Sequence, residues 1–185
     1  MNVYDFDGTI YNGDSSVNFL LYALKKKPGT LLYLPKQLWG FVLYALKKID
    51  KTTLKEYYFS FLAAVDAMAL AESFWDEQEG RIFDWYLRQR QEDDMVISAS
   101  PDFLLRPICR RLGISRLIAS RVDARSGKFT GANCHDVEKP KRLAAEYGLT
   151  KVEAFYSDSL SDLPMAQIAE RAYMVKKGKV EDWNI

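Results

Sequence analysis

Two kinds of apolar pattern alternate along the chain. Short apolar runs predict buried strands at residues 2–5, 95–100, 116–122, 128–132, 152–158 and 172–175. Apolar residues at helical spacing predict helices over 17–27, 31–48, 50–65, 67–92 (one or two), 101–112, 138–147 and near 161–169. Asp14 or Ser15 and Asp50 or Thr52 suit the first two helix starts, and Gly148 suits a helix end.

The order of these elements predicts the fold class. Strands alternate with helices from residue 93 onward, which favours an α/β, Rossmann-like core: a parallel sheet with helices on both faces. The first strand is separated from the others by a helical block. We therefore predict a core of residues 1–14 and 93–185, interrupted by an all-helical cap over 15–92.

Composition and charge bear on partners. The chain is 48% hydrophobic and 28% charged, as in a globular protein, and its net charge of +1 gives no bulk attraction to nucleic acid. The charges are unevenly spread, with eight lysines between Lys25 and Lys55 and nine acids between Asp66 and Asp94. The block 20–48 has two interpretations: amphipathic helices with solvated lysines, or a peripheral surface for anionic membrane. No protein partner is implied.

The compartment follows from what the chain contains. Asp5 and Asp7 stand where the apolar part of a signal peptide would begin, and the apolar segment 31–46 is short and contains Pro35 and Lys36. With two cysteines, reduced thiols are expected rather than a disulfide framework. These features predict a cytoplasmic protein.

Polar side chains follow three of the predicted strands. Asp5 and Asp7 come after the first, Ser98 ends the second, and Asp158 and Asp162 follow a later one. Asp-x-Asp-Gly alone is also typical of an exposed turn. Ligands bind beyond the carboxyl ends of such strands, and four carboxylates can supply the hard oxygens that Mg²⁺ prefers. Lys139 would balance their charge, and Ser98 would donate to a phosphate oxygen.

The sequence resembles the haloacid dehalogenase superfamily of aspartate-nucleophile phosphatases. "DFDGT" is similar to its first motif, Ser98 in "VISAS" to the second, Lys139 in "VEKPKRL" to the third and "SDSLSD" to the fourth. The helical insert between the first two motifs resembles the phosphoserine-phosphatase-like branch. The resemblance covers the core and has all four motifs in order.

The resemblance implies a mechanism with an aspartyl-phosphate intermediate. Asp5 would attack phosphorus, and Asp7 would act as general acid and then as base toward water. Asp5, Asp158 and the Asp7 backbone carbonyl would bind Mg²⁺, and Asp162 would support the metal. Thr9 would orient Asp7 and lie with Ser98 and Lys139 among the phosphate-binding residues.

Several alternatives remain open. Ser100 competes with Ser98 and Lys141 with Lys139, whereas His135 is predicted to be an exposed loop residue and Cys109 and Cys134 plain thiols. The predicted substrate is a small phosphorylated metabolite such as phosphoserine. A phospholipid head group at the membrane surface, similar to that of phosphatidylglycerophosphate phosphatases, is the alternative. Two further alternatives are an enzyme that transfers the phosphoryl group to a second substrate and a non-catalytic phosphate-binding module.

Overall fold

A six-stranded sheet forms the centre of the computed structural model, which describes residues 1–184. The strand order is β3-β2-β1-β4-β5-β6, in which β1 to β5 are parallel and β6 runs antiparallel to β5. The strands are β1 (Asn2–Tyr4), β2 (Met95–Pro101), β3 (Arg116–Ser120), β4 (Val152–Ser157), β5 (Ala169–Lys176) and β6 (Lys179–Asp182). The predicted α/β fold class is confirmed.

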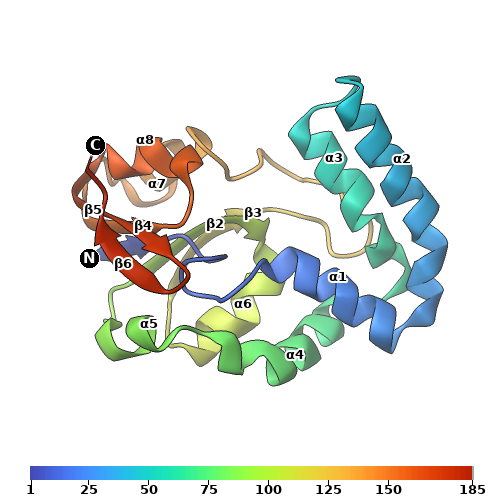
Figure 1. The fold of residues 1–185 in the computed structure, drawn as a ribbon, viewed down its shortest axis with the longest axis horizontal. Helices are drawn as coiled ribbons and strands as arrows, with labels where there is room; N and C mark the ends of the chain where they lie inside the picture. The colour runs from blue at the N-terminus through green and yellow to red at the C-terminus, as the bar shows by residue number, and fades with distance from the viewer. Residues whose placement is uncertain (185) are drawn as a thin grey trace.

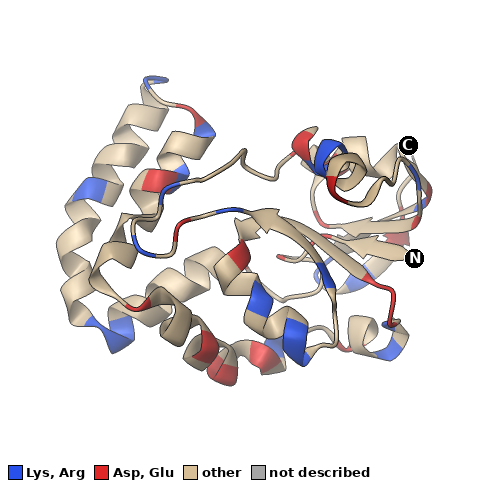
Figure 2. Ribbon diagram, turned by 180° about the vertical axis from the view of Figure 1, so that it is seen from behind, with Lys and Arg blue, Asp and Glu red and all other residues tan. Residues whose placement is uncertain are grey.

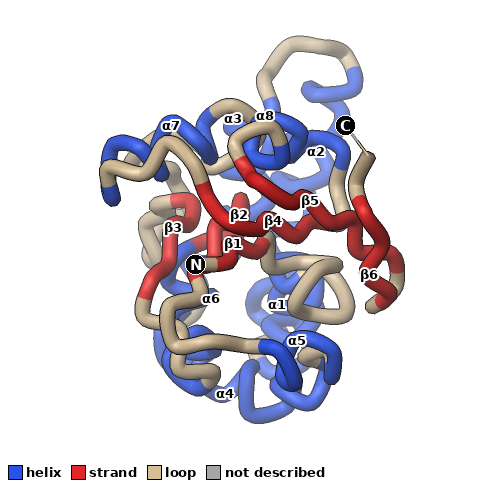
Figure 3. The backbone as a smooth tube through the Cα atoms, turned by 90° about the vertical axis from the view of Figure 1, so that its left-hand side faces the viewer, coloured by secondary structure: helices blue, strands red, loops and turns tan. Residues whose placement is uncertain are grey.

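Helices cover both faces of the sheet. Figure 3 shows α7 and α8 on one face and α1, α4, α5 and α6 on the other. The helices are α1 (Ser15–Lys26), α2 (Leu34–Ala45), α3 (Lys51–Tyr58), α4 (Ala67–Gln78), α5 (Asp84–Gln89), α6 (Asp102–Arg111), α7 (Glu138–Tyr147) and α8 (Leu163–Ala166). Short 3₁₀ turns are η1 (Pro28–Tyr33), η2 (Phe59–Ala64), η3 (Glu79–Arg81) and η4 (Leu160–Asp162). In residues 1–184, no helix combines the length and apolar character needed to cross a bilayer.

The helices between β1 and β2 divide into two groups. Phe19 of α1 and Phe74 and Trp75 of α4 are fully buried in the cluster that also contains Phe6 and Leu104. In contrast, α2 and α3 pair with each other and extend beside the sheet (Figure 1). The boundaries of the predicted cap, at residues 15 and 92, stay a prediction.

Local signals set several element ends correctly. The Asp14 carboxylate accepts from Val17 N at 2.9 Å and caps α1, and Asp50 accepts from Thr53 N at 2.7 Å and caps α3. Gly148 ends α7 with a φ of 69°, which is left-handed backbone.

In the second half of the chain, two predicted elements are wrong or incomplete and one strand was not predicted. Residues 128–132 form no strand, because their pairing is limited to one bridge between Val122 and Phe129. The helix near 161–169 is shorter than predicted, because α8 spans only Leu163–Ala166 after the turn η4, and β5 begins at Ala169. The strand β6 was not predicted. It follows a two-residue hairpin turn, Lys177–Gly178, in which both residues have positive φ.

Candidate active site

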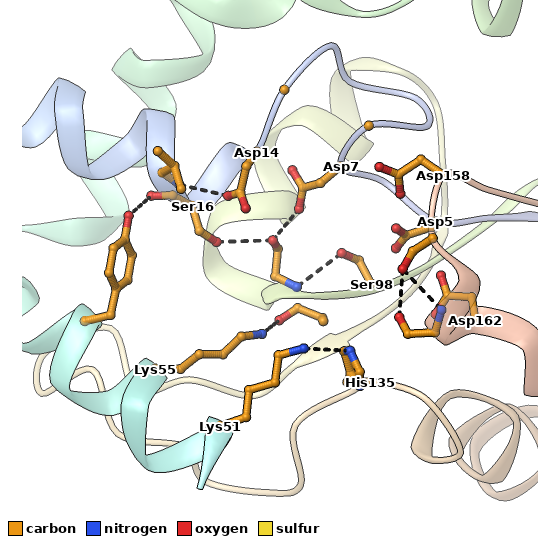
Figure 4. A pocket seen from close by; sticks show the side chains of 18 of the residues that line it. Asp5, Asp7, Asp14, Ser16, Lys51, Lys55, Ser98, His135, Asp158 and Asp162 are labelled. Carbon is orange, nitrogen blue, oxygen red and sulfur yellow. Dashed lines mark hydrogen bonds between the residues drawn. The ribbon is translucent and has the colours of Figure 1, made fainter. Parts of the chain in front are cut away.

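The predicted strand-end residues meet at one cavity of about 650 Å³. Asp5 and Asp7 follow β1, Ser98 lies near the end of β2, and Asp158 follows β4. These strands are adjacent and parallel, so their carboxyl ends share one edge of the sheet. Lys139 near the start of α7 also lines the cavity. So does Asp162 in η4, which Figure 4 shows beside Asp5.

Asp5 is held by a buried lysine. Lys139 Nζ lies 2.9 Å from Asp5 Oδ1 and 2.7 Å from Asp162 Oδ2, and the lysine is 2% exposed. Burial by itself lowers the pKa of Lys139, but the two carboxylates outweigh it and leave that pKa raised. Burial also raises the pKa of Asp5, against the opposing charge of Lys139. Because Lys139 faces two carboxylates at hydrogen-bond distance, we assign it as the charged ammonium.

Hydrogen bonds from the other side of the cavity hold Asp7. Its carboxylate accepts from Ser15 N at 2.6 Å and from the Ser100 hydroxyl. Burial and the neighbouring Asp14 raise the pKa of Asp7 to about 6, although the hydrogen bonds from Ser100 and Ser15 oppose the shift. A carboxyl with such a pKa can both release and accept a proton near neutral pH.

The structure separates the two pairs of competing residues. Ser98 is buried and its hydroxyl accepts from Ser100 N at 3.1 Å, whereas the Ser100 hydroxyl is used by Asp7. Lys139 lies in the cavity, while Lys141 is exposed and pairs with Glu138. Ser98 and Ser100 both line the cavity, whereas Lys139 does so and Lys141 does not. The phosphate-binding roles of Ser98 and Lys139 stay predictions.

Thr9 does not lie as predicted. It is fully buried, and its hydroxyl has no hydrogen-bond partner among residues 1–184. The orientation of Asp7 therefore comes from Ser15 and Ser100.

The loop after β1 is shaped for close approach by Asp158. Gly8 has a φ of +70°, and a Cβ placed on it would lie 2.0 Å from Asp158 Oδ2. Any side chain at position 8 would displace that carboxylate. Partial burial raises the pKa of Asp158, so the loop and cavity disfavour its charge when no cation is near.

The donor set fits a hard divalent cation of the magnesium type. Asp5, Asp7 and Asp158 bring carboxylate oxygens to the cavity, and burial raises the pKa of each, a cost that a nearby cation would offset. Within residues 1–184, no three His, Cys, Asp or Glu side chains converge on one metal position. A cation here would need backbone oxygen and water as well, as Mg²⁺ commonly has. Asp162 is engaged by Lys139 and by Ser157 at 2.7 Å.

The sequence did not predict which residues of the helical block line the cavity. Lys51 and Lys55 of α3 line the cavity, and His135, predicted to be exposed, is partly buried beside them. Lys51 Nζ lies 2.8 Å from His135 Nε2. The i,i+4 spacing of the lysines was visible in the sequence, but the direction of α3 was not.

The fold and this cavity define an α/β protein with a cluster of carboxylates and a buried lysine at the carboxyl ends of its parallel strands. A model of the family of haloacid dehalogenase-like hydrolases matches residues 3–167. The chain belongs to this family.

Individual relatives agree with this assignment. Protein CicA of Caulobacter vibrioides is 28% identical over 198 residues, covering 95% of this chain and 86% of CicA. A probable phosphatase of Mycobacterium tuberculosis is 33% identical over 107 residues, covering 50% of this chain and 37% of that protein.

Solved structures share the fold. A Bordetella pertussis protein of unknown function has a TM-score of 0.75 at 20% identity, over 93% of this chain and 87% of that one. A substrate-bound phosphoserine phosphatase has a TM-score of 0.56 at 16% identity, over 92% and 83%. The predicted family and fold are confirmed, and the family is one of haloacid dehalogenase-like hydrolases.

Proposed function

We propose that the chain hydrolyses phosphomonoesters through an aspartyl-phosphate on Asp5. The observation that carries this proposal is the meeting of Asp5, Asp7, Ser98 and Lys139 in one cavity at the ends of adjacent strands. Lys139 holds Asp5 from one side, which leaves the carboxylate oriented and partly neutralised for an anionic substrate.

Each residue has a distinct role in the proposed reaction. An Asp5 oxygen attacks phosphorus and the ester P–O bond breaks, while Asp7 gives a proton to the leaving oxygen. Asp7 then takes a proton from water, which attacks phosphorus and releases inorganic phosphate and free Asp5. Ser98 donates a hydrogen bond to a phosphoryl oxygen, and Lys139 balances the negative charge. Thr9 packs in the loop that carries Asp7.

We propose Mg²⁺ as the cofactor, held by Asp5, Asp158 and the backbone carbonyl of Asp7. Asp162 would support it through Lys139 or through water. When bound, the cation would offset the repulsion between the carboxylates and the phosphate and stabilise the charge of the transferring phosphoryl group.

The proposed substrate is a small phosphorylated metabolite such as phosphoserine. A cavity of about 650 Å³ is of the size that encloses small molecules. We propose the cytoplasm as the compartment, with Cys109 and Cys134 as buried free thiols in support.

The test is release of phosphate from an aryl phosphate and from phosphorylated metabolites. Activity is expected with Mg²⁺, to disappear in a chelator and to be inhibited by Ca²⁺, which takes more ligands at longer distances. The Asp5→Asn variant is expected to be inactive, because an amide is a poor nucleophile. A non-catalytic binding module would bind phosphate without turnover. Full activity in a chelator would contradict the metal assignment.

An exposed apolar surface favours a second candidate, a phospholipid head group at the membrane. On η1 and α2, Leu32 is 83% exposed, Leu38 65% and Trp39 56%. Lysines lie before η1, within α2 and after α2. Figure 2 shows basic residues at both ends of α2, the outer helix of the pair. Peripheral contact with anionic membrane would bring the cavity, which Phe41 of α2 also lines, to a lipid substrate.

A further inference from the structure

The cavity has a basic wall that the proposed chemistry does not use. Lys51 and Lys55 lie one turn apart on α3, and His135 comes from the loop before α7. Figure 4 shows the two lysines reaching into the cavity from the side opposite Asp5, Asp7 and Asp158. These basic groups therefore face the space next to the position proposed for the phosphoryl group.

The positive charge of this wall is not neutralised by an ion pair. Within residues 1–184, neither lysine has a carboxylate at ion-pair distance, whereas Lys26, Lys141 and Lys176 each have one. Lys55 Nζ donates to two neutral acceptors, Ala99 O at 2.9 Å and Asn133 Oδ1 at 3.1 Å. Burial and the charge of Lys51 lower the pKa of Lys55 to about 8. An anion between the lysines would relieve this repulsion.

The position of Lys55 fixes where such an anion would lie. Its contact with Ala99, the residue after Ser98, places one ammonium at the edge of the proposed phosphate site. Lys51 is one helical turn away and is exposed, and it contacts His135. Apolar side chains of Phe41 and Leu54 line the same side of the cavity. A substrate that reaches Lys51 must therefore extend beyond its phosphoryl group.

We infer that Lys51 and Lys55, with His135, form a subsite for a second anionic group on the phosphomonoester substrate. The inference rests on the proposed function and names its substrate class. A carboxylate of a soluble metabolite and the phosphodiester of a lipid head group share this chemistry. Charge-assisted hydrogen bonds to such a group contribute more than neutral ones.

The test compares substrates with one and two anionic groups. The value of kcat/KM for 3-phosphoglycerate relative to glycerol 3-phosphate is expected to fall about 10-fold in Lys51→Gln, the loss of one charged hydrogen bond. Lys51→Glu is expected to lower it further and to favour phosphoethanolamine. The exposed Lys151, just before β4 and outside the cavity lining, gives the control Lys151→Gln, which should keep the wild-type ratio. Thermal melts show whether each variant is folded.

The outcomes separate this inference from the proposed function. Equal losses with both substrates would place the lysines on the transferred phosphoryl group and overturn the inference, as would no loss with either. If the wild type hydrolyses no phosphomonoester, the proposed function is contradicted. Calorimetric titration of the two compounds into the Asp5→Asn protein then still measures the preference for binding 3-phosphoglycerate. The same titration with Lys51→Gln added to that protein measures the loss of this preference. A short-chain phosphatidylglycerophosphate in the same assay distinguishes a lipid phosphodiester from a metabolite carboxylate.

Discussion

Asp5 and Asp7 are two residues apart, yet different elements hold them. Asp5 is paired with Lys139 of α7, whereas Asp7 is hydrogen-bonded by Ser15 of α1 and Ser100 of β2. Lys139 favours the charged form of Asp5, the proposed nucleophile, although burial still raises the pKa of Asp5 to about 7. Asp7 has no cationic partner within ion-pair distance among residues 1–184, and its pKa of about 6 suits proton transfer.

The first prediction concerns Asp7. In Asp7→Asn, hydrolysis of an alkyl phosphate is expected to slow by about 10²–10⁴-fold, because proton transfer to the leaving oxygen is lost. Release of p-nitrophenol, which needs no proton, is expected to slow less, and phosphoenzyme to accumulate. Rapid-quench assays with both substrates measure the difference. Equal slowing would show that position 7 does not protonate the leaving group.

Asp94, just before β2, gives a second prediction at a single residue. It is fully buried and one carboxylate oxygen has no partner among residues 1–184. Burial raises its pKa to about 6. Because the folded state then holds a proton that the unfolded state releases, stability falls as pH rises from about 4 to about 6. The linked loss is up to about 3 kcal/mol.

In Asp94→Asn this loss is expected to disappear, since the amide does not ionise and its oxygen can still accept from Gln91 N. Urea unfolding of both proteins at pH 4 and pH 7 measures this loss of stability. The control is Glu92→Gln at a nearby, exposed position. Identical pH dependence in the Asp94 variant and the wild type would contradict the prediction.

The sequence identified the residues whose position follows from strand ends. Asp5, Asp7, Ser98 and Asp158 were predictable, since parallel strands place their carboxyl ends at one edge. Lys51, Lys55 and His135 were not, because their approach depends on how α3 packs against the core. Contacts such as Tyr58 Oη to Ser16 O at 3.0 Å fix that packing, and no local pattern specifies them.

Among the elements, α2 and α3 depend on one close approach. A Cβ on Gly40 of α2 would lie 2.4 Å from the Cβ of Tyr57 on α3. Neither atom is at the end of a flexible side chain, so the helices would have to separate.

Gly40→Ala is therefore expected to lower the free energy of unfolding by about 1–3 kcal/mol, the usual cost of overpacking. The gain in helix propensity, about 1 kcal/mol, offsets part of this cost. Denaturant unfolding measures the change in the free energy of unfolding. Gly80→Ala is the control, because no atom lies within 4 Å of a Cβ placed at Gly80. A Gly40→Ala protein more stable than the control would show that the helices accommodate the methyl group.

The errors in the predicted elements have physical causes. Residues 128–132 include Phe129 and Thr130, which favour a strand, but only one bridge forms there, between Val122 and Phe129. The strand β6 is fully exposed, so it has no apolar alternation to reveal it. Only its turn residues, Lys177 and Gly178, signalled the hairpin.

The molecule as a whole joins a buried core to an unpaired apolar surface. One face of α1 and one face of α4 are buried in the core cluster, whereas α2 has only Gln37 and Gly40 buried. We define the outer surface as Leu31, Leu32, Leu38, Trp39 and Val42, each at least 46% exposed. Such a surface on a chain of this size is typical of an interaction site. The surrounding lysines favour an anionic bilayer as its partner.

The last prediction is binding to phosphatidylglycerol vesicles and not to phosphatidylcholine vesicles. Each lysine near the surface contributes about 1 kcal/mol, over a Debye length of about 8–10 Å, so binding should weaken as salt rises. Replacing Lys25, Lys26 and Lys27 by Gln should weaken it. Lys26 already pairs with Glu77 at 2.8 Å, so Lys36, Lys47 and Lys48 should matter more as a set. Vesicle sedimentation measures each protein.

Trp39→Ser separates the apolar part of this binding from the electrostatic part. It should weaken binding at every salt concentration, because burial of an indole ring does not depend on ionic strength. Leu87→Ser on α5, 41% exposed and outside the outer surface, is the matched control and should bind as wild type. Protein that remains in the supernatant at low salt would contradict membrane contact. If sedimentation equilibrium then gives a dimer that Trp39→Ser dissociates, the outer surface binds a second copy of the chain.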